Sequence, residues 1–360
     1  MAEVHTERRE RLRARCAAAG IDAALVTRPV NVRWLTGADA VQALLLTRDG
    51  VVLAPAEGVH PEQGAAADQP EGVELLRAAP GADAAALLAA RCRGAVLGFE
   101  AHDLTVLRHH AVAAATGARL TDLEGAVERL RAVKDEDEIA QLRIAAEIGD
   151  QALGELLESI LVGRTERHLA MELERRMVDH GADGAAYPVR VGSGDHSGRA
   201  GHRATDRRVE DGDFVTVALG ACYRGYRTSA TRTFVVGLAP ADWQVELHRQ
   251  VFEAQRAARE SLVAGAAPDS AELAARRVLD AAGLLGEVTG QGIGLEIAEA
   301  PRLGLQELGK LDNRVPVTVA VGVHLPGRGG VRIEDTLVVR PSEDGGPELL
   351  TITTKELLAL

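Results

Sequence analysis

The stretch from residue 212 to residue 234 constrains this chain most, because it predicts a β-hairpin that presents two positions on one face. Residues 214–219 alternate as a strand does, and residues 227–236 return as a run rich in Thr and Val. Positions 218 and 229 of this hairpin would suit two carboxylates that grip a pair of metal ions. The chain instead has Ala218 and Ser229 there. A methyl group cannot ligate a divalent ion, and a hydroxyl is a poor neutral substitute, so we expect the frame of a metal site without its ligands.

Length and composition limit the class of protein. A chain of 360 residues with 46% hydrophobic residues can fill the cores of two domains. The net charge of −12 argues against a nucleic-acid partner, since phosphate binding needs clustered Lys and Arg. The three cysteines are scattered, which argues against a disulfide framework or a zinc cluster. The charged start does not resemble a signal peptide, and no run of about 18 apolar residues exists to cross a membrane, so we expect a cytoplasmic protein.

The order of the elements predicts two domains. Strand and helix patterns alternate in the first part of the chain, which indicates a small three-layer α/β domain over residues 1–125. Within it, residues 29–37 are expected to be a connecting segment that carries a tryptophan. Residues 126–360 are expected to form the second domain, in which residues 186–194 are predicted to be a strand that leads into a polar loop.

From about Arg131 onward the chain closely resembles the family of Xaa-Pro aminopeptidases, prolidases and creatinase. Three motifs carry the resemblance: Gly-Tyr-x-x-x-x-Thr-Arg-Thr-Phe at 225–234, Gly-Ile-Gly-Leu-Glu-Ile-Ala-Glu-Ala-Pro at 292–301, and Gly-Gly-Val-Arg-Ile-Glu-Asp at 329–335. The segment at 31–37 resembles the family's smaller accessory domain. The resemblance implies an α/β (α+β) fold. A creatinase-like N-terminal domain would precede a pita-bread domain, a curved antiparallel sheet flanked by helices.

The peptidases of this family hold two divalent metals with two Asp, one His and two Glu, and four of these five positions differ here. The two Asp fall on Ala218 and Ser229. The His falls on Gln291 and the first Glu on Ala320, so only the last Glu survives, as Glu334. Several anionic ligands are needed to offset the dehydration of two cations. The resemblance therefore implies no dinuclear metal site, and we expect no metal and no cofactor.

A metal site rebuilt from nearby residues is a minor alternative. Its candidate ligands are Glu287, Glu296, Glu299, His202 and His324. Glu296 and Glu299 already belong to the family's own pattern, so their presence needs no metal to explain it.

The family's substrate-handling and proton-handling histidines are also replaced. They fall on Gly201, Glu287 and Ala298. The residues expected to carry chemistry in the retained pocket are His202, His324 and Glu334, with a histidine as the acid or base. The residues expected to bind the ligand are Arg332, Gln291, Ser229 and Glu299. The alternatives are a solvated His202, a His324 that fills the place of a tyrosine, and a structural Glu334–Arg332 ion pair.

Three functions fit these observations. The first is a metal-independent enzyme, a repurposed hydrolase or lyase that acts on a small amino-acid-like or peptide-like molecule, for which creatinase is the precedent within the resemblance. The second is an inactive pseudopeptidase that serves as a binding or scaffold protein. The third, an ordinary Xaa-Pro dipeptidase, comes last because the metal ligands are missing. The expected partners are a small-molecule or short-peptide ligand and a second copy of the chain in a homodimer, with no nucleic acid and no membrane.

Overall fold

The computed structural model describes residues 2–55, 73–76, 79, 81–304 and 307–360. The chain divides into two compact units, Met1–Arg131 and Ala132–Leu360. Each unit has its own sheet and its own apolar core. No helix in the described ranges combines the length and the apolar character needed to cross a bilayer.

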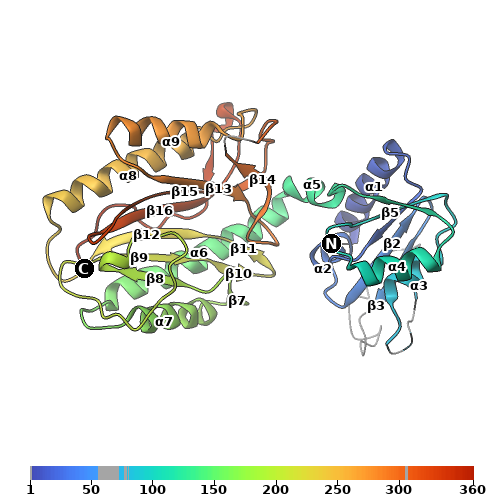
Figure 1. The fold of residues 1–360 in the computed structure, drawn as a ribbon, viewed down its shortest axis with the longest axis horizontal. Helices are drawn as coiled ribbons and strands as arrows, with labels where there is room; N and C mark the ends of the chain where they lie inside the picture. Colours follow the sequence, from blue (N-terminus) through green and yellow to red (C-terminus); the bar gives the residue numbers. More distant parts are fainter. Residues whose placement is uncertain (1, 56–72, 77–78, 80, 305–306) are drawn as a thin grey trace. The chain divides into compact units, whose positions relative to one another are not determined.

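The smaller unit is a mixed sheet covered by helices (Figure 1). Its described strands lie in the order β4-β3-β2-β1-β5-β6, with β1 antiparallel to β2 and parallel to β5. The strands are β1 (Ala23–Val26), β2 (Val41–Thr47), β3 (Val51–Pro55), β4 (Val73–Leu75), β5 (Val96–Phe99) and β6 (Arg119–Asp122). The helices are α1 (Ala2–Ala18), α2 (Pro29–Thr36), α3 (Ala84–Ala89), α4 (Val106–Ala115) and α5 (Ala126–Ala132), the last of which ends at the boundary between the units.

Helix α2 corrects the expectation of a connecting segment over residues 29–37. Pro29 begins the helix, where the backbone N–H that proline lacks would have no partner in any case. Gly37 follows the last turn in the left-handed conformation, with φ 74°, and its N–H bonds back to the carbonyl of Arg33. The start and stop signals were both present in the sequence, but the helix is only eight residues long and its apolar pattern is short.

The larger unit is built on an antiparallel sheet. Its described strands lie in the order β14-β13-β15-β16-β12-β9-β8, and β17 adds to β16. They are β8 (Arg190–Ser193), β9 (Phe214–Leu219), β12 (Ala230–Val235), β13 (Glu287–Gly292), β14 (Glu299–Leu303), β15 (Pro316–Leu325), β16 (Gly329–Val338) and β17 (Glu348–Leu349). A small second sheet contains β7 (Gly184–Ala185), β10 (Ala221–Tyr223) and β11 (Tyr226–Arg227). The central hairpin predicted from the sequence is β9 and β12, whose residues Phe214 to Leu219 pair with Val235 to Ala230.

Two pairs of helices pack on this sheet (Figure 1). They are α6 (Glu136–Ser159), α7 (Glu166–Asp179), α8 (Asp242–Glu260) and α9 (Ser270–Ala281). One core packs α6 and α7 against strands β8, β9 and β12. The other packs α8 and α9 against strands that include β15 and β16. The sheet is therefore apolar where helices cover it.

Glu334 and Asp335 are neighbours on β16 but lie on opposite sides of the strand, because side chains alternate along a strand. Asp335 is fully buried and pairs with the guanidinium of Arg232 at 2.8 Å, and Gln255 of α8 donates to its other oxygen. Glu334 lies on the other side of the strand and lines a cavity. The alternation thus separates a structural ion pair from the candidate site.

Candidate functional site

A cavity of about 290 Å³ lies in the larger unit and is lined from several strands of its sheet. Ala218 of β9 and Ser229, which precedes β12, both line it, as does Glu334 of β16. The segment after β8 contributes His196, in a short 3-10 turn, and His202. The pocket expected from the sequence is thus present, and Ala218 and Ser229 of the predicted hairpin line it together with Glu334.

Two hydroxyl groups hold the Glu334 carboxylate in the cavity. Ser229 Oγ donates to Oε1 at 2.9 Å, and Thr231 Oγ1 donates to Oε2 at 2.9 Å. The strands place them there because Thr231 pairs directly with Glu334 across β12 and β16. Tyr187 Oη lies 2.9 Å from Ser229 Oγ and also donates to the carbonyl of Leu219 at 2.8 Å. Each oxygen of Glu334 therefore accepts a hydrogen bond from a neutral group.

The family's five ligand positions do not fit two cations in this structure. Ala218, Ser229 and Gln291 line the cavity beside Glu334, but only Glu334 supplies a carboxylate. The amide nitrogen of Gln291 donates to the Ile297 carbonyl at 2.9 Å. Ala320 is buried and lies opposite Glu334 in the β15–β16 ladder. One carboxylate and one amide cannot offset the dehydration of two divalent ions at these positions.

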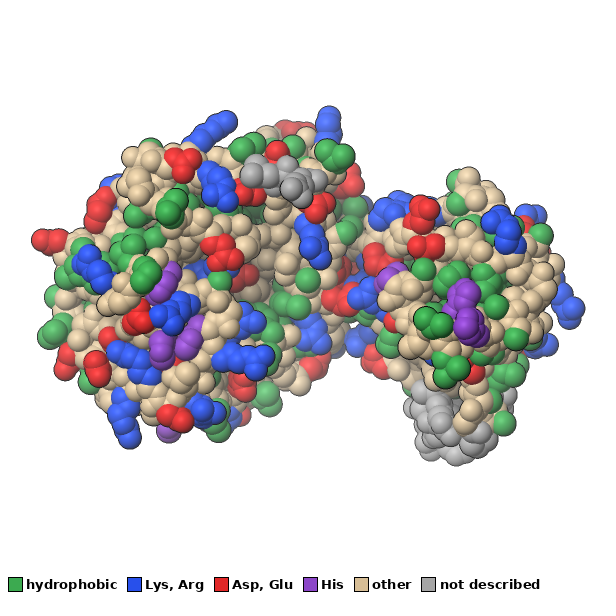
Figure 2. Space-filling view, viewed as in Figure 1, with side chains coloured by type: hydrophobic (Ala, Val, Ile, Leu, Met, Phe, Trp, Pro, Cys, Tyr) green, Lys and Arg blue, Asp and Glu red, His purple; other side chains and the backbone are tan. Residues whose placement is uncertain are grey.

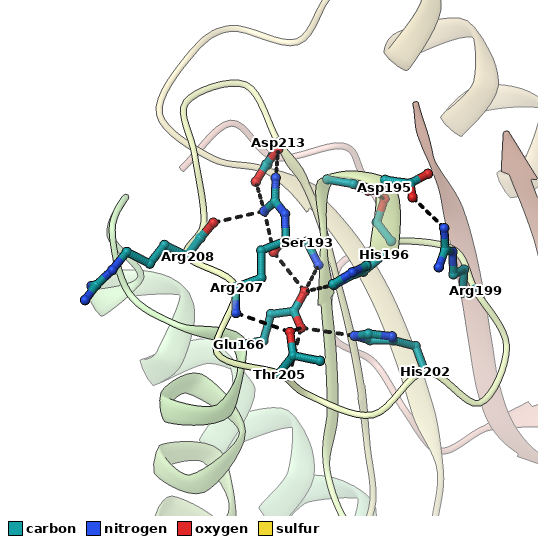
Figure 3. A network of polar contacts seen from close by, with 12 residues as sticks. Glu166, Ser193, Asp195, His196, Arg199, His202, Thr205, Arg207, Arg208 and Asp213 are labelled. Atoms are coloured by element: carbon teal, nitrogen blue, oxygen red, sulfur yellow. Dashed lines mark hydrogen bonds and ion pairs between the residues drawn. The ribbon is translucent and has the colours of Figure 1, made fainter. Parts of the chain in front are cut away.

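A second polar centre lies on the wall of the same cavity, around Glu166 (Figure 3). Glu166 begins helix α7, where Thr165 caps the helix by accepting a hydrogen bond from the N–H of His168. His196 Nδ1 lies 2.9 Å from Glu166 Oε1, and His202 Nε2 lies 3.0 Å from Oε2. The two imidazole rings are 4.4 Å apart between centroids. One buried carboxylate thus orients both histidines that line the cavity.

The backbone and hydroxyl groups around Glu166 keep it ionised. Ser193 donates its N–H and its hydroxyl to Oε1, and Thr205 donates its N–H and its hydroxyl to Oε2. Burial opposes ionisation, but the hydrogen bonds from His202, Thr205 and Ser193 outweigh it and lower the pKa of Glu166 to about 2. Glu166 is therefore an anion throughout the physiological pH range.

Glu166, His196 and His202 also have the donor set of a single divalent ion. Among the described residues they form a group whose ligand atoms, a carboxylate oxygen and two imidazole nitrogens, all lie within 4.8 Å of one another. Imidazole and carboxylate suit zinc, iron and other divalent transition metals. The two ions that the fold implies therefore lack most of their ligands at the family's own positions, whereas this cluster has the donor types that one ion needs.

Arg332 and His324, which were also predicted from the sequence, each contact partners of their own. Arg332 lines the cavity, donates to Thr289 at 2.9 Å and pairs with Glu287 at 3.1 Å. His324 lies beside Arg199, whose Nε donates to its Nε2 at 3.2 Å, while its Nδ1 lies 3.0 Å from the Ser197 carbonyl.

Glu299 is not among the residues that line the cavity, although it was proposed to bind the ligand. It is bound in a buried ion pair with Lys134 at 2.7 Å, in which the side chains are 5% and 2% exposed. A carboxylate that neutralises a buried ammonium group has a structural role.

Four residues of the site were missed in the sequence analysis: Glu166, His196, Tyr187 and Arg190. All of them except Glu166 line the cavity. Thr165 followed by Glu166 was readable as a helix start, but nothing in the local pattern shows that Glu166 bonds to residues 27 to 39 positions further along.

Comparisons with known proteins assign the family. The profile of the creatinase/prolidase N-terminal domain matches residues 8–133, and that of metallopeptidase family M24 matches residues 140–341. The chain belongs to metallopeptidase family M24, the pita-bread family of Xaa-Pro peptidases, as the resemblance implied. The fold class predicted from the sequence, a small N-terminal α/β domain followed by a pita-bread domain, is confirmed.

Individual relatives agree with this assignment. The chain is 32% identical over 356 residues to the uncharacterized peptidase YqhT of Bacillus subtilis, covering 98% of this chain and 99% of the relative. It is 35% identical over 240 residues to the Xaa-Pro dipeptidase of Pyrococcus furiosus, covering 66% and 68% of the two chains. Among solved structures, an Xaa-Pro dipeptidase from Bacillus anthracis superposes with a TM-score of 0.91 at 33% identity, covering 99% and 100%.

These matches overturn the expected function. A metal-independent, repurposed enzyme has no support, because the relatives that span the chain are peptidases and the cavity wall carries a cluster with metal-binding donors. The inactive scaffold has no support either. The expectation was wrong because it equated the loss of four ligand positions with the loss of peptidase chemistry. The donor groups of Glu166 and His196 lie outside the motifs that carried the resemblance.

Proposed function

We propose that this chain is a peptidase that hydrolyses short peptides in the Glu334 cavity, with Xaa-Pro dipeptides as the substrate class. The observation that carries the proposal is the meeting, in one cavity, of Glu334 with two histidines that a buried carboxylate orients. The relatives that bear the name Xaa-Pro dipeptidase support the substrate class.

His202 is suited to move a proton because Glu166 holds one of its ring nitrogens. The Nε2–H group of His202 donates to Glu166, which leaves Nδ1 as the nitrogen that can accept a proton from water. A carboxylate that holds an imidazole in one tautomer, and stabilises the cation formed on protonation, is a recurrent device in hydrolases. His196 is held in the same way through Nδ1, which leaves its Nε2 available.

Glu166, His196 and His202 would hold one divalent ion, which would take the place of the hydrogen bonds between the carboxylate and the two imidazole rings. When bound there, such an ion lowers the pKa of a water molecule and polarises a carbonyl group. We propose one ion and not two, since Ala218, Ser229 and Ala320 offer no anionic ligand.

Other cavity residues are suited to position the peptide. Gln291 uses its amide N–H on a backbone carbonyl, so its amide oxygen is the atom it presents to a substrate donor. The Arg332 guanidinium is fixed by Glu287 and Thr289 and stands at the cavity wall.

Proline release from a panel of dipeptides tests the proposal. The purified full chain is incubated with Ala-Pro, Gly-Pro and Leu-Pro after treatment with a chelator, and again with Mn²⁺, Zn²⁺ or Co²⁺ added. A parallel purification from cells without the gene measures contaminating peptidase. We expect proline release above that background in at least one metal condition. Release no greater than background in every condition would overturn the proposal.

A further inference from the structure

We infer that the cavity selects an anionic substrate, a short peptide-like molecule that carries a second carboxylate which pairs with Arg190. The inference rests on the proposed function in one respect only, namely that the cavity is the substrate site. Its evidence is the charge of the cavity lining.

The lining is rich in cations although the whole chain is acidic. Arg190, Arg199 and Arg332 line the cavity together with His196 and His202, while Glu334 supplies its single carboxylate among the described residues. The formal net charge of the chain is −12. Figure 2 shows His side chains grouped with Lys or Arg side chains on the face of the larger unit that it presents. An arginine in a concave site that no carboxylate neutralises attracts anionic ligands.

Arg190 differs from the other two arginines in its pairing. Arg199 forms an ion pair with Asp195, and Arg332 forms one with Glu287. Arg190 has no carboxylate partner in the part of the chain that the structure describes, and its guanidinium stands over the ring of Tyr187, 5.6 Å from the centroid. An exposed guanidinium that is fixed on an aromatic face and unpaired is available to a carboxylate of a ligand.

Tyr187 links Arg190 to the centre of the site. The tyrosine hydroxyl lies 2.9 Å from Ser229 Oγ, which donates to Glu334. Burial raises the pKa of Tyr187 well above its usual range, and Glu334 raises it further, whereas Arg190 and Arg332 lower it. Arg190 thus packs on the ring of the tyrosine whose hydroxyl contacts Ser229, the residue that donates to Glu334.

The same lining offers little to a cationic group. Glu334 is its only carboxylate within the described ranges, and each of its oxygens already accepts a hydroxyl hydrogen bond. An ammonium group would therefore face the Arg190 guanidinium, which no carboxylate of the described residues neutralises, while the one lining carboxylate is already hydrogen-bonded. A ligand whose amine is acylated, or whose first side chain is acidic, avoids this repulsion and gains Arg190.

Titration calorimetry on the full chain tests the inference with four probes that share a C-terminal proline. Glutaryl-proline carries two carboxylates and no amine, Glu-Pro adds an amine, Gly-Pro lacks the second carboxylate, and Lys-Pro replaces it with a cation. We expect glutaryl-proline to bind at least about tenfold more tightly than Lys-Pro, with the other two between, since glutaryl-proline gains a charge-assisted hydrogen bond to Arg190 and brings no ammonium group. Added KCl should narrow the difference.

The variant Arg190→Gln should remove most of this preference, whereas Arg277→Gln, which removes an exposed charge on α9, should keep it. Equal binding of glutaryl-proline and Lys-Pro, binding of neither, or a preference unchanged in Arg190→Gln would overturn the inference. The outcome is separable from that of the proline assay. Anion-selective binding without proline release overturns the proposed function alone, and proline release without selectivity overturns this inference alone.

Discussion

Ser229 donates a hydrogen bond of 2.9 Å to the Glu334 carboxylate, and this bond joins the predicted hairpin to strand β16. The hydroxyl bonds to a carboxylate oxygen at a position where the resemblance implies a second carboxylate that shares a metal with Glu334. The Thr231 hydroxyl donates to the other oxygen of Glu334. The strands that frame the site are therefore kept, while a neutral hydroxyl stands where the resemblance implies a carboxylate. The first prediction concerns this hydrogen bond.

Removal of the Ser229 hydroxyl should destabilise the larger unit. In Ser229→Ala, Glu334 loses one of its two hydroxyl donors and Tyr187 loses its neighbour in the cavity, so the free energy of unfolding should fall by about 1–2 kcal/mol. Urea denaturation measures the change. Ser342→Ala, which removes a hydroxyl from an exposed residue, should leave the free energy unchanged. An equal effect of the two variants would show that the Glu334 contact carries no energy.

Asp335 should matter far more than its neighbour for stability. It is fully buried, and it neutralises Arg232 while also accepting from Gln255 and Thr351. Asp335→Asn leaves the buried guanidinium without its anion, and the cost should be about 3–5 kcal/mol. Asp344→Asn, at an exposed position, is the control. Urea denaturation in which both variants match the unmodified chain would contradict this account of the core.

The His248 side chain should make stability depend on pH in a definite window. Burial lowers the pKa of His248 to about 4 from its ordinary 6.5, and its Nε2 has no hydrogen-bond partner among the residues that the structure describes. Below pH 6.5 the unfolded chain takes up a proton that the folded chain does not. Stability is therefore lost as the pH falls from 6.5 to 4, by at most about 3 kcal/mol.

Denaturation midpoints at pH 7.5 and pH 4.5 check this effect by comparison with His248→Leu. The variant should show a smaller loss of stability between the two pH values. The depressed pKa of Glu166 acts in a lower window, from about 4.5 down to 2, so the two groups are separable. A pH dependence identical in the variant and the unmodified chain would refute the role of His248.

Metal analysis should find at most one divalent ion per chain. The Glu166 cluster offers three ligands, whereas Ala218, Ser229 and Ala320 offer no anion. After dialysis against Zn²⁺ and removal of free metal, the double variant His196→Ala/His202→Ala should lose any ion that the unmodified chain retains. His168→Ala, which removes an exposed histidine of α7, should not change the stoichiometry. Two ions per chain, or an ion that survives the double variant, would contradict the assignment.

The frame of the site was readable from the sequence, and the second polar centre was not. The hairpin pattern predicted the paired strands β9 and β12, and the Gly-Gly-Val-Arg-Ile-Glu-Asp motif marked Glu334, because strand alternation and a motif are local signals. The partners of Glu166 lie in a loop 27 to 39 residues away, and no periodicity predicts how that loop folds back. Glu299 was misassigned for the same reason, since its partner Lys134 is 165 residues away.

The rate of proline release from a cleaved dipeptide, compared between His202→Ala and His168→Ala, tests the central claim most directly. The claim is that hydrolysis takes place in the Glu334 cavity and uses a histidine held by Glu166. In the metal condition that supports release, kcat/KM should fall about 100-fold or more in His202→Ala and stay within a few-fold of the unmodified chain in His168→Ala. Equal rates in the two variants would contradict the claim.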